Sequence, residues 1–422
     1  MFSNLVALNL GSDKITAAIS GDNSAEFEIL DSVEVLSKGI ENGIIKDKEL
    51  AAECIKEALK KLSEKTSKSI KSVYISLGTK SSRIISNKGI HLSGNSDLGI
   101  TSKEISKAYL NGKNVKINEN EYIADAIINE FYTEQEGYVE NPLRIKSSSL
   151  EVDLDIVVSE KEIIEDIKEV FSGLGYEIKG FLLGIASLKK IFLDEKTVSK
   201  NLVIVEVGAD KTEIAYFSKN RLKSLGYVPL GGRNITNDLS IAIERDKEIA
   251  EKLKCEYSSS YITLRRDFSK IDADGNIIEA DFFYDVVNAR IEEILNYVKK
   301  ELELSGIYDK IEDIIIFGDG ITCFEDIQAY IESILEKNIT IYTKDELNLE
   351  NSSTLVSIAI VKEVYDRLKL LYKEENFSEK LFMEYNNNIK NNEIEDEKKT
   401  EVIKKEKKKG LSKVFGFLGD IF

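Results

Sequence analysis

The chain has 422 residues, 42% of them hydrophobic and 32% charged, which is enough apolar material for a large core divided among two or three domains. Its 75 acidic and 58 basic residues give a formal net charge of −17, so the chain as a whole repels phosphate backbones and nucleic acid is excluded as a partner. The only histidine is His91, which excludes a His-rich zinc site and an HExxH protease. We expect His91 to be a surface or loop residue, with no catalytic triad and no resident metal centre.

The cysteines and the N-terminal sequence indicate a cytoplasmic protein. Cys54, Cys255 and Cys323 are isolated in the sequence and form no CxxC motif, so we expect reduced thiols in the core. The first twelve residues lack the basic region and apolar run of a signal peptide. No window reaches the roughly 18 consecutive apolar residues of a transmembrane helix.

Two stretches far apart in the sequence share one pattern of strand, glycine turn and strand. Residues 6–10 lead through GSDK at 11–14 into an apolar run, and residues 203–207 lead through GADK at 208–211 into another. The flanks are apolar and β-branched, as in strands that a tight turn joins. A matched pair of this kind, one in each half of the chain, predicts a duplicated architecture.

Strands and helices alternate along the rest of the chain. Helical spacing occurs at residues 47–62, with Asp47 as the N-cap, and at 161–174, 286–304 and 354–373. Strand-like runs occur at residues 73–77, 152–158, 314–317 and 339–342. This alternation predicts an α/β fold with partly parallel sheets.

Glycine turns opposed across a cleft can present backbone N–H groups and hydroxyls to phosphates. YVPLGGRNITND at 227–238 is typical of a strand, a glycine turn and a helix capped by Asn or Thr. Glu251 and Lys254 share one helix face and could meet a ribose, while a purine could lie against the glycines of IIIFGDG at 314–320. The candidate ligand-binding residues are Gly11, Ser12, Lys14, Glu206, Gly208, Lys211, Thr212, Gly231, Gly232, Glu251, Lys254, Gly318 and Gly320.

The sequence changes character after about residue 376. Residues 386–409 are almost wholly polar and charged, which is typical of a disordered linker, and we place this linker at 376–409. Residues 410–422, GLSKVFGFLGDIF, form an amphipathic helix of about 18 Å that is too short to span a bilayer. Because a lysine cluster precedes it, we predict a helix that binds an anionic membrane surface rather than one docked on the core. The predicted membrane-binding residues are Leu411, Val414, Phe415, Phe417, Leu418, Ile421, Phe422, Lys407, Lys408 and Lys409.

The order of these motifs from about residue 6 to 371 resembles the actin-like superfamily, and specifically the FtsA family of bacterial cell-division proteins. The stretches that carry the resemblance are VPLGGRNITNDLSIAI, AEKLK, NARIEEILNYVKKEL, ENPLRIKSSSLEVDLDIV at 140–157, and GLGYEIKGFLLGIASLKKIF at 173–192. The last of these is similar to the family's inter-lobe helix. The resemblance implies an α/β, duplicated actin-like (RNase H-type) fold of two lobes, with an inserted subdomain in the first lobe.

The resemblance also implies a domain division. It places the first-lobe core (1A) at 1–80 and 161–195, the inserted subdomain (1C) at 81–160, the second-lobe core (2A) at 196–227 and 304–375, and the outer subdomain (2B) at 228–303. A linker at 376–409 and the membrane-targeting helix at 410–422 follow.

The function that the resemblance implies is that of a membrane tether for division filaments. Such a protein binds ATP with Mg²⁺ between its lobes, polymerises with itself, and binds the C-terminal tail of the tubulin-like protein FtsZ. Arg290 matches a position that contacts this tail. The implied place is the cytoplasmic face of the cell membrane at the division septum, with anionic lipids and later division proteins as further partners.

The sequence departs from the family pattern at three turns. Asn9 stands where the first turn usually has an acid, Asp210 stands where the second turn usually has glycine, and Asp319 replaces a glycine of the adenine turn. Because Asn9 removes a carboxylate that would help to organise Mg²⁺ and water, we expect ATP to bind but to be hydrolysed slowly or not at all. Two alternatives share the fold: an actin-like assembly protein of a pilus-type machine, and an ATPase or phosphotransferase.

Overall fold

The computed structural model describes residues 4–21, 27–92, 99–193, 197–258, 269–343 and 352–372. The chain divides into two compact units. The described residues of the first lie within 4–85, 116–127 and 155–364, and those of the second lie within 86–115, 128–154 and 365–372. The predicted linker at 376–409 and membrane helix at 410–422 lie outside the described residues.

The first unit contains two five-stranded sheets. The strands of the first sheet are β1 (Val6–Leu10), β2 (Lys14–Ser20), β3 (Ile29–Leu36), β6 (Ser72–Leu77) and β11 (Glu177–Leu183). The strands of the second sheet are β12 (Asn201–Val207), β13 (Thr212–Ser218), β14 (Arg221–Val228), β17 (Asp313–Phe317) and β18 (Asn338–Tyr342). Their central strands are buried on both faces, which explains the continuous apolar runs in the sequence.

The two sheets have the same topology. The first has the order β11-β6-β1-β2-β3, and the second, read from its other edge, has the order β18-β17-β12-β13-β14. In each sheet the three strands that come first along the chain, β1–β3 or β12–β14, form an antiparallel meander. The remaining two strands pair in parallel with each other and with the first strand of the meander. The predicted duplication and α/β fold are therefore confirmed.

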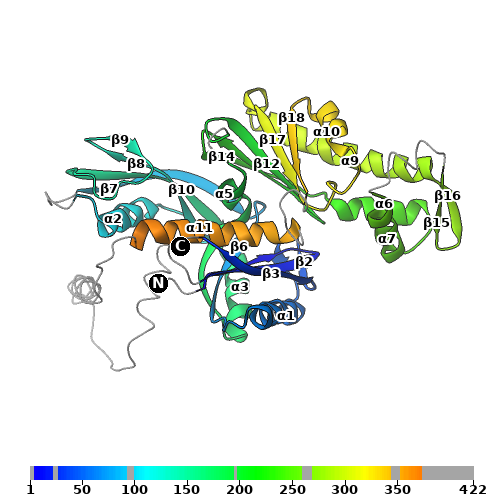
Figure 1. Ribbon diagram of the computed structural model, residues 1–422, viewed down its shortest axis with the longest axis horizontal. Helices are drawn as coiled ribbons and strands as arrows, with labels where there is room; N and C mark the ends of the chain where they lie inside the picture. Colours follow the sequence, from blue (N-terminus) through cyan, green and yellow to red (C-terminus); the bar gives the residue numbers. More distant parts are fainter. Residues whose placement is uncertain are drawn as a thin grey trace. The chain divides into compact units, whose positions relative to one another are not determined.

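Helices cover these sheets (Figure 1). The elements beside the first sheet are α1 (Lys48–Thr66), α3 (Lys161–Gly173), α4 (Gly184–Ser187), α5 (Lys189–Phe192) and the two-residue strands β4 (Ile40–Glu41) and β5 (Ile44–Ile45). Beside the second sheet lie α9 (Ala280–Leu304), η2 (Tyr308–Lys310) and α10 (Ile327–Leu335). Helices α6 (Gly232–Ala242) and α7 (Lys247–Tyr257) and the hairpin of β15 (Lys270–Ala273) and β16 (Asn276–Glu279) pack around one end of α9 (Figure 1). Helix α1 packs on β2 and β3, and α9 packs on β13 and β14.

The start of α1 follows the sequence prediction closely. The Asp47 carboxylate accepts hydrogen bonds from the backbone N–H groups of Glu49 and Leu50, both at 3.0 Å, as expected of an N-cap. The helical spacing predicts one buried face with Leu50, Cys54, Ala58 and Leu62; the last three are buried, whereas Leu50 in the first turn is 40% exposed. Local sequence therefore determined where this helix begins and most of the face it buries.

A late segment of the chain contacts the first sheet. It consists of η3 (Ser352–Thr354) and α11 (Leu355–Tyr372). The Thr16 hydroxyl on β2 lies 2.6 Å from the Ser357 hydroxyl on α11, and the Ser353 hydroxyl donates to Glu34 on β3 at 2.5 Å. Residues more than 300 positions apart thus complete one layer of the first lobe.

A separate four-stranded sheet has the order β7-β10-β8-β9. Its strands are β7 (Ser82–Leu92), β8 (Glu121–Thr133), β9 (Gly137–Val139) and β10 (Ser149–Glu160), and α2 (Ser102–Lys113) accompanies it. His91 was expected to be a surface or loop residue; it lies on strand β7, half-buried, and not in a loop. Burial and the nearby Lys107 lower the pKa of His91, which keeps the imidazole neutral at pH 7.

One element was predicted wrongly in type. The stretch 173–192 resembled a long inter-lobe helix, but residues 177–183 form strand β11, which pairs in parallel with β6. Only the short helices α4 and α5 follow it. Apolar residues in this stretch are buried on a sheet edge rather than along a helix face, and their local spacing does not distinguish the two.

Candidate functional site

The two glycine turns lie at the ends of β1 and β12, one in each five-stranded sheet. In the second turn, the Gly208 N–H donates to the Lys211 carbonyl at 2.9 Å and closes the hairpin. In the first turn, the Ser12 hydroxyl accepts a hydrogen bond from the Asn42 N–H at 2.8 Å. Both turns therefore have a fixed shape, and the Ser12 hydroxyl keeps its own proton for donation.

Helix α6 begins directly against the second turn. The Gly232 N–H donates to the Gly208 carbonyl at 2.9 Å, and the Arg233 N–H donates to the Ala209 carbonyl at 2.8 Å. A Cβ on Gly231 would lie 2.4 Å from the Gly208 oxygen, so only glycine permits this approach. The N–H groups that a helix N-terminus usually offers to an anion are used here to hold the turn.

The cap of α6 differs from the prediction. Gly231 is the N-cap, whereas we expected Asn or Thr in this position. Asn234 in the first turn of the helix contributes instead, because its side-chain oxygen accepts from the Gly231 N–H at 2.9 Å. The glycine is required by the contact with the second turn, which the local sequence does not reveal.

The loop after β17 packs against the second turn and the start of α6, and the three glycine-containing segments together form what we call the glycine wall. Gly318 has a φ of +99°, and the Gly320 N–H donates to the Val207 carbonyl at 3.0 Å. A Cβ on Gly320 would lie 2.7 Å from the Gly208 oxygen. Three glycine-containing segments, at 208–209, 231–232 and 318–320, thus pack backbone to backbone.

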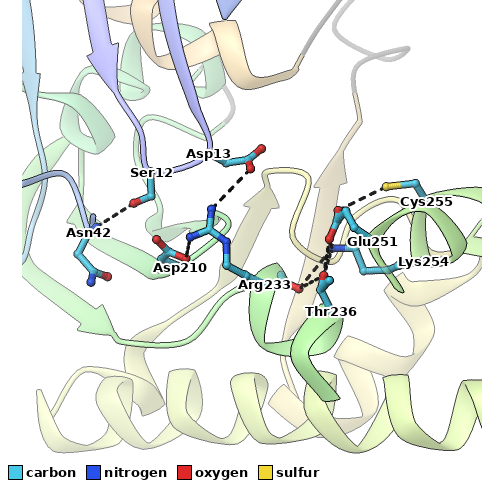
Figure 2. A network of polar contacts seen from close by, with 10 residues as sticks. Ser12, Asp13, Asn42, Asp210, Arg233, Thr236, Glu251, Lys254 and Cys255 are labelled. Carbon is cyan, nitrogen blue, oxygen red and sulfur yellow. Dashed lines mark hydrogen bonds and ion pairs between the residues drawn. The ribbon is translucent and has the colours of Figure 1, made fainter. Parts of the chain in front are cut away.

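One arginine connects the two turns (Figure 2). The Arg233 guanidinium forms an ion pair with Asp210 of the second turn through Nη1, and its Nη2 lies 3.6 Å from Asp13 Oδ1 of the first turn. The two aspartates occupy the same offset in GSDK and GADK. Arg233, Asp13 and Asp210 were all missing from the predicted site residues.

The two turn lysines point to different partners. Lys14 Nζ lies 3.2 Å from Glu34 on β3 and 4.0 Å from Asp319. Lys211 Nζ lies 2.5 Å from Glu213 on β13, so the ammonium group is paired away from Asp210. Arg233 forms the ion pair with Asp210 instead.

A small enclosed cavity lies beside the Lys211–Glu213 pair. Its volume is about 20 Å³, which is room for one water molecule, and its lining includes Asn9, Ser76 and Glu206. The Glu213 carboxylate also accepts from the Thr79 N–H, which follows β6 of the first sheet. Loss of hydration and the nearby Glu213 charge, opposed by Lys211, raise the pKa of Glu206 to about 7.

This cavity does not fit Mg²⁺. A hydrated magnesium ion needs six oxygen ligands in octahedral geometry, which a one-water space cannot hold. The Lys211 ammonium already supplies positive charge to the two carboxyl groups. Among the described residues, moreover, no group of three His, Cys, Asp or Glu is placed to hold a metal ion.

Helices α6 and α7 are joined by a buried lysine. Lys254 Nζ donates to the Gly232 carbonyl at 3.3 Å, to the Thr236 hydroxyl at 3.0 Å and to Glu251 at 2.7 Å. Lys254 is therefore engaged within the protein, whereas the Glu251 side chain remains 48% exposed. Of this predicted ribose-binding pair, only Glu251 faces solvent. Although partial burial opposes the effect, Lys254 lowers the pKa of Glu251 and keeps it ionised.

The cysteines near this cluster are not core thiols. Cys54 is buried as expected, but Cys255 and Cys323 are exposed. Burial of part of its side chain and the neighbouring Glu251 raise the pKa of Cys255 to about 11. The Cys255 thiol is therefore protonated and weakly nucleophilic at neutral pH.

Arg290 on α9 is bonded within the protein. Its Nε and Nη2 contact both oxygens of Asp238 on α6, at 2.5 and 3.0 Å, and its Nη1 contacts Glu293. A neighbouring groove of about 460 Å³ is lined by Ala289, Glu292, Glu293, Asn296, Tyr297 and Lys300. Arg290 thus lies beside a groove, with its guanidinium already paired.

The predicted membrane-binding residues lie outside the described part of the chain. In the part that the structure does describe, every helix is too short or too polar to cross a bilayer.

Comparison with known proteins gives consistent similarities. A family model described as "Cell division protein FtsA" matches residues 203–359. The chain is 24% identical to the cell division protein FtsA of Bacillus subtilis over 259 residues, which cover 59% of this chain and 58% of that relative, less than two thirds of its length. Other curated proteins with the same name match at 20–24% identity.

Solved structures show the same fold. The chain resembles a structure of the PilM-PilN type IV pilus biogenesis complex with a TM-score of 0.55 and 13% identity, over 87% of this chain and 98% of that one. It resembles MreB 5 of Spiroplasma citri bound to AMPPNP with a TM-score of 0.50 and 13% identity, over 87% and 98% of the two chains. These similarities establish an actin-like fold.

Proposed function

Because the chain is a divergent member of the FtsA family of cell-division proteins, we propose that it is an ATP-binding filament protein that tethers FtsZ filaments to the inner face of the cytoplasmic membrane. In this proposal it polymerises, binds the FtsZ C-terminal tail and recruits later division proteins at the septum. The domain division that the resemblance implied, from 1A at residues 1–80 to the helix at 410–422, is part of the proposal.

Nucleotide binding is best supported by the two sheets of identical topology, because an arginine forms ion pairs with the glycine turns of both sheets. Asp13 and Asp210 come from opposite lobes, and Arg233 connects them beside the glycine wall. Backbone groups of such turns recognise phosphates without side-chain bulk. The resemblance to an MreB structure bound to AMPPNP agrees with this use of the fold.

Slow hydrolysis is part of the same proposal. Asn9 lines the small cavity where an attacking water could be held, but an amide cannot act as a general base. Glu206 lines this cavity too, and with a pKa of about 7 it carries its proton for part of the time. The site therefore suits nucleotide binding as a structural signal better than turnover.

The proposed FtsZ contact is the exposed face of α9 beside Arg290. Arginine can pair bidentately with a peptide carboxylate, but here Asp238 and Glu293 occupy the guanidinium. An acidic tail would have to displace these partners or bind in the neighbouring groove. Arg290→Glu and Arg290→Lys test whether Arg290 contacts the tail directly. If it does, both variants should lose affinity for a tail peptide. If its role is purely structural, both should destabilise the α6–α9 contact and keep their affinity for the peptide.

The membrane part of the proposal concerns residues 410–422. Co-sedimentation with vesicles that contain anionic lipid tests this part. The full chain is compared with a chain truncated before residue 410 and with the Leu418→Glu variant. We expect the full chain to bind and to carry FtsZ down with it, because the apolar helix face and the lysines act together. Equal sedimentation of the truncated protein would remove this segment from the proposal.

A second candidate function is assembly in a pilus-type machine. The similarity to the PilM-PilN complex structure favours it, since that fold match covers most of both chains. Binding of the FtsZ tail by this chain decides between the two, because a pilus component has no need for it. If the chain binds vesicles but not the FtsZ tail, the hypothesis of a pilus-type assembly protein is favoured.

A further inference from the structure

We propose that Arg233 is a binding residue for the phosphate chain of the nucleotide, and that Asp13 and Asp210 hold its guanidinium in place until a nucleotide replaces Asp13. This inference rests on the proposed nucleotide binding and specifies how that site is regulated.

The position of Arg233 is the first argument. Its backbone is fixed against the second turn by the N–H bond to the Ala209 carbonyl at 2.8 Å. Its guanidinium lies between the carboxylates of both turns, with Asp210 in direct contact and Asp13 at 3.6 Å. A planar guanidinium that pairs with two carboxylates has the geometry to pair with two phosphate oxygens instead.

Exposure of the side chain is the second argument. Four basic side chains make ion pairs around the described glycine turns, and their exposed fractions are 40% for Arg233, 31% for Lys14, 15% for Lys211 and 5% for Lys254. The two least exposed are bonded to Glu213 and Glu251 inside the protein. Lys14 is held by Glu34 on β3. Arg233 is the cation most open to a ligand that enters between the turns.

The charge balance is the third argument. Asp13, Asp210 and Arg233 together carry one net negative charge, which opposes a polyphosphate. Asp13 is 54% exposed and its contact with Arg233 is loose, so it can turn into solvent at little cost. Asp210 is only 16% exposed and stays in the turn. A nucleotide therefore exchanges the Asp13–Arg233 contact for a phosphate–Arg233 contact, and the bridge between the two turns passes through the ligand.

Isothermal titration with ATP, inorganic triphosphate and adenosine tests this exchange, with and without Mg²⁺. We expect Arg233→Gln to weaken ATP and triphosphate binding about tenfold, as for loss of a charged hydrogen bond, and to leave adenosine binding unchanged. Arg233→Lys should keep part of the affinity. Asp13→Asn should tighten ATP binding severalfold, because it removes both the competitor and a repulsive charge. Arg83→Gln, which breaks the exposed ion pair with Glu121, is the matched control without effect.

The outcomes distinguish this inference from the proposed function. Equal ATP affinity in wild type, Arg233→Gln and Asp13→Asn overturns the inference and leaves nucleotide binding intact. A loss of adenosine binding as large as the loss of ATP binding also overturns it, since Arg233 would then act only on the fold. No binding in any variant, wild type included, overturns both. If Arg233→Gln does not fold, Arg233→Lys and Asp13→Asn decide the question alone.

Discussion

The two glycine turns, GSDK at 11–14 and GADK at 208–211, have nearly the same sequence but different surroundings. The first is bounded by solvent and by the β4–β5 segment, through the Ser12–Asn42 hydrogen bond. The second is enclosed by α6 and by the loop after β17, and its lysine points inward to Glu213. The same offset thus places Lys14 in a half-exposed pair and Lys211 in a buried one.

This difference shows that a duplicated motif conserves backbone shape more strictly than side-chain role. Both turns join the first two strands of a meander and have equivalent neighbours in their sheets. What distinguishes them is packing from elements outside the repeat, chiefly α6 and its glycines. The second turn is therefore the more enclosed half of the site, and the first turn is the more exposed half.

The largest expected effect comes from breaking the buried lysine pair. Lys211→Met should lower the free energy of unfolding by about 3 kcal/mol, because it leaves the Glu213 and Glu206 carboxyl groups without their cation. Lys14→Met should cost less than about 1 kcal/mol, since its pair with Glu34 is partly solvated. Urea unfolding followed by circular dichroism measures both. Equal losses would mean that the two turns are energetically alike.

A smaller loss of folding stability is expected from disturbing the contact between Gly231 and the second turn. Gly231→Ala should cost about 2 kcal/mol, because its Cβ would meet the Gly208 and Ala209 backbone, which cannot move without shifting α6. Gly173→Ala at the end of α3 is the matched control, with open space around the new methyl group. It should be neutral or slightly stabilising. A thermal midpoint for Gly231→Ala equal to that of the control contradicts the close contact.

The smallest expected effect is a pH dependence that belongs to the second turn alone. The pKa of Glu206 is about 7 in the folded chain and about 4.5 when unfolded, so its contribution is fully favourable below pH 4.5 and is lost as pH rises through 7. Glu206→Gln should therefore stabilise the protein by roughly 1–2 kcal/mol at pH 8 and have little effect at pH 4.

Asn9 provides the complementary test, because it occupies the equivalent position before the first turn. Asn9→Asp adds a carboxyl group to the cavity lining and should steepen the loss of stability between pH 5 and 8. Unfolding curves at several pH values compare the two variants. A wild-type stability that does not fall over this range would contradict the shifted pKa of Glu206.

Most of the fold could be predicted from the sequence, because its signals are local. The two hairpins, the strands β6, β17 and β18, and the helices α3 and α11 lie close to their predicted bounds, whereas α9 begins six residues earlier and α1 ends four residues later than predicted. Asp47 was identified as a cap because capping depends on residues two and three positions away. Strand β11 was missed because an apolar run on a sheet edge and one on a helix face can look alike.

The site could be predicted only in part. Glycines were found because they mark backbone approaches, and the structure brings the predicted residues of the turns, α6, α7 and the loop after β17 together. Arg233 was overlooked although it directly follows the two glycines, and Glu213 was overlooked because it looked like an ordinary strand residue. Lys254 appeared free on its helix, but the carbonyl of Gly232 and the hydroxyl of Thr236 hold it. Such pairings depend on tertiary contacts that spacing does not encode.

The contact of η3 and α11 with the first sheet has a consequence for synthesis on the ribosome. Strands β2 and β3 emerge early, yet the hydroxyls that bond to Thr16 and Glu34 belong to Ser357 and Ser353. The N-terminal lobe therefore cannot complete its packing while the second lobe is still being translated. A nascent chain arrested before residue 350 should be cleaved readily by protease within the first sheet, and one extended past residue 372 should resist.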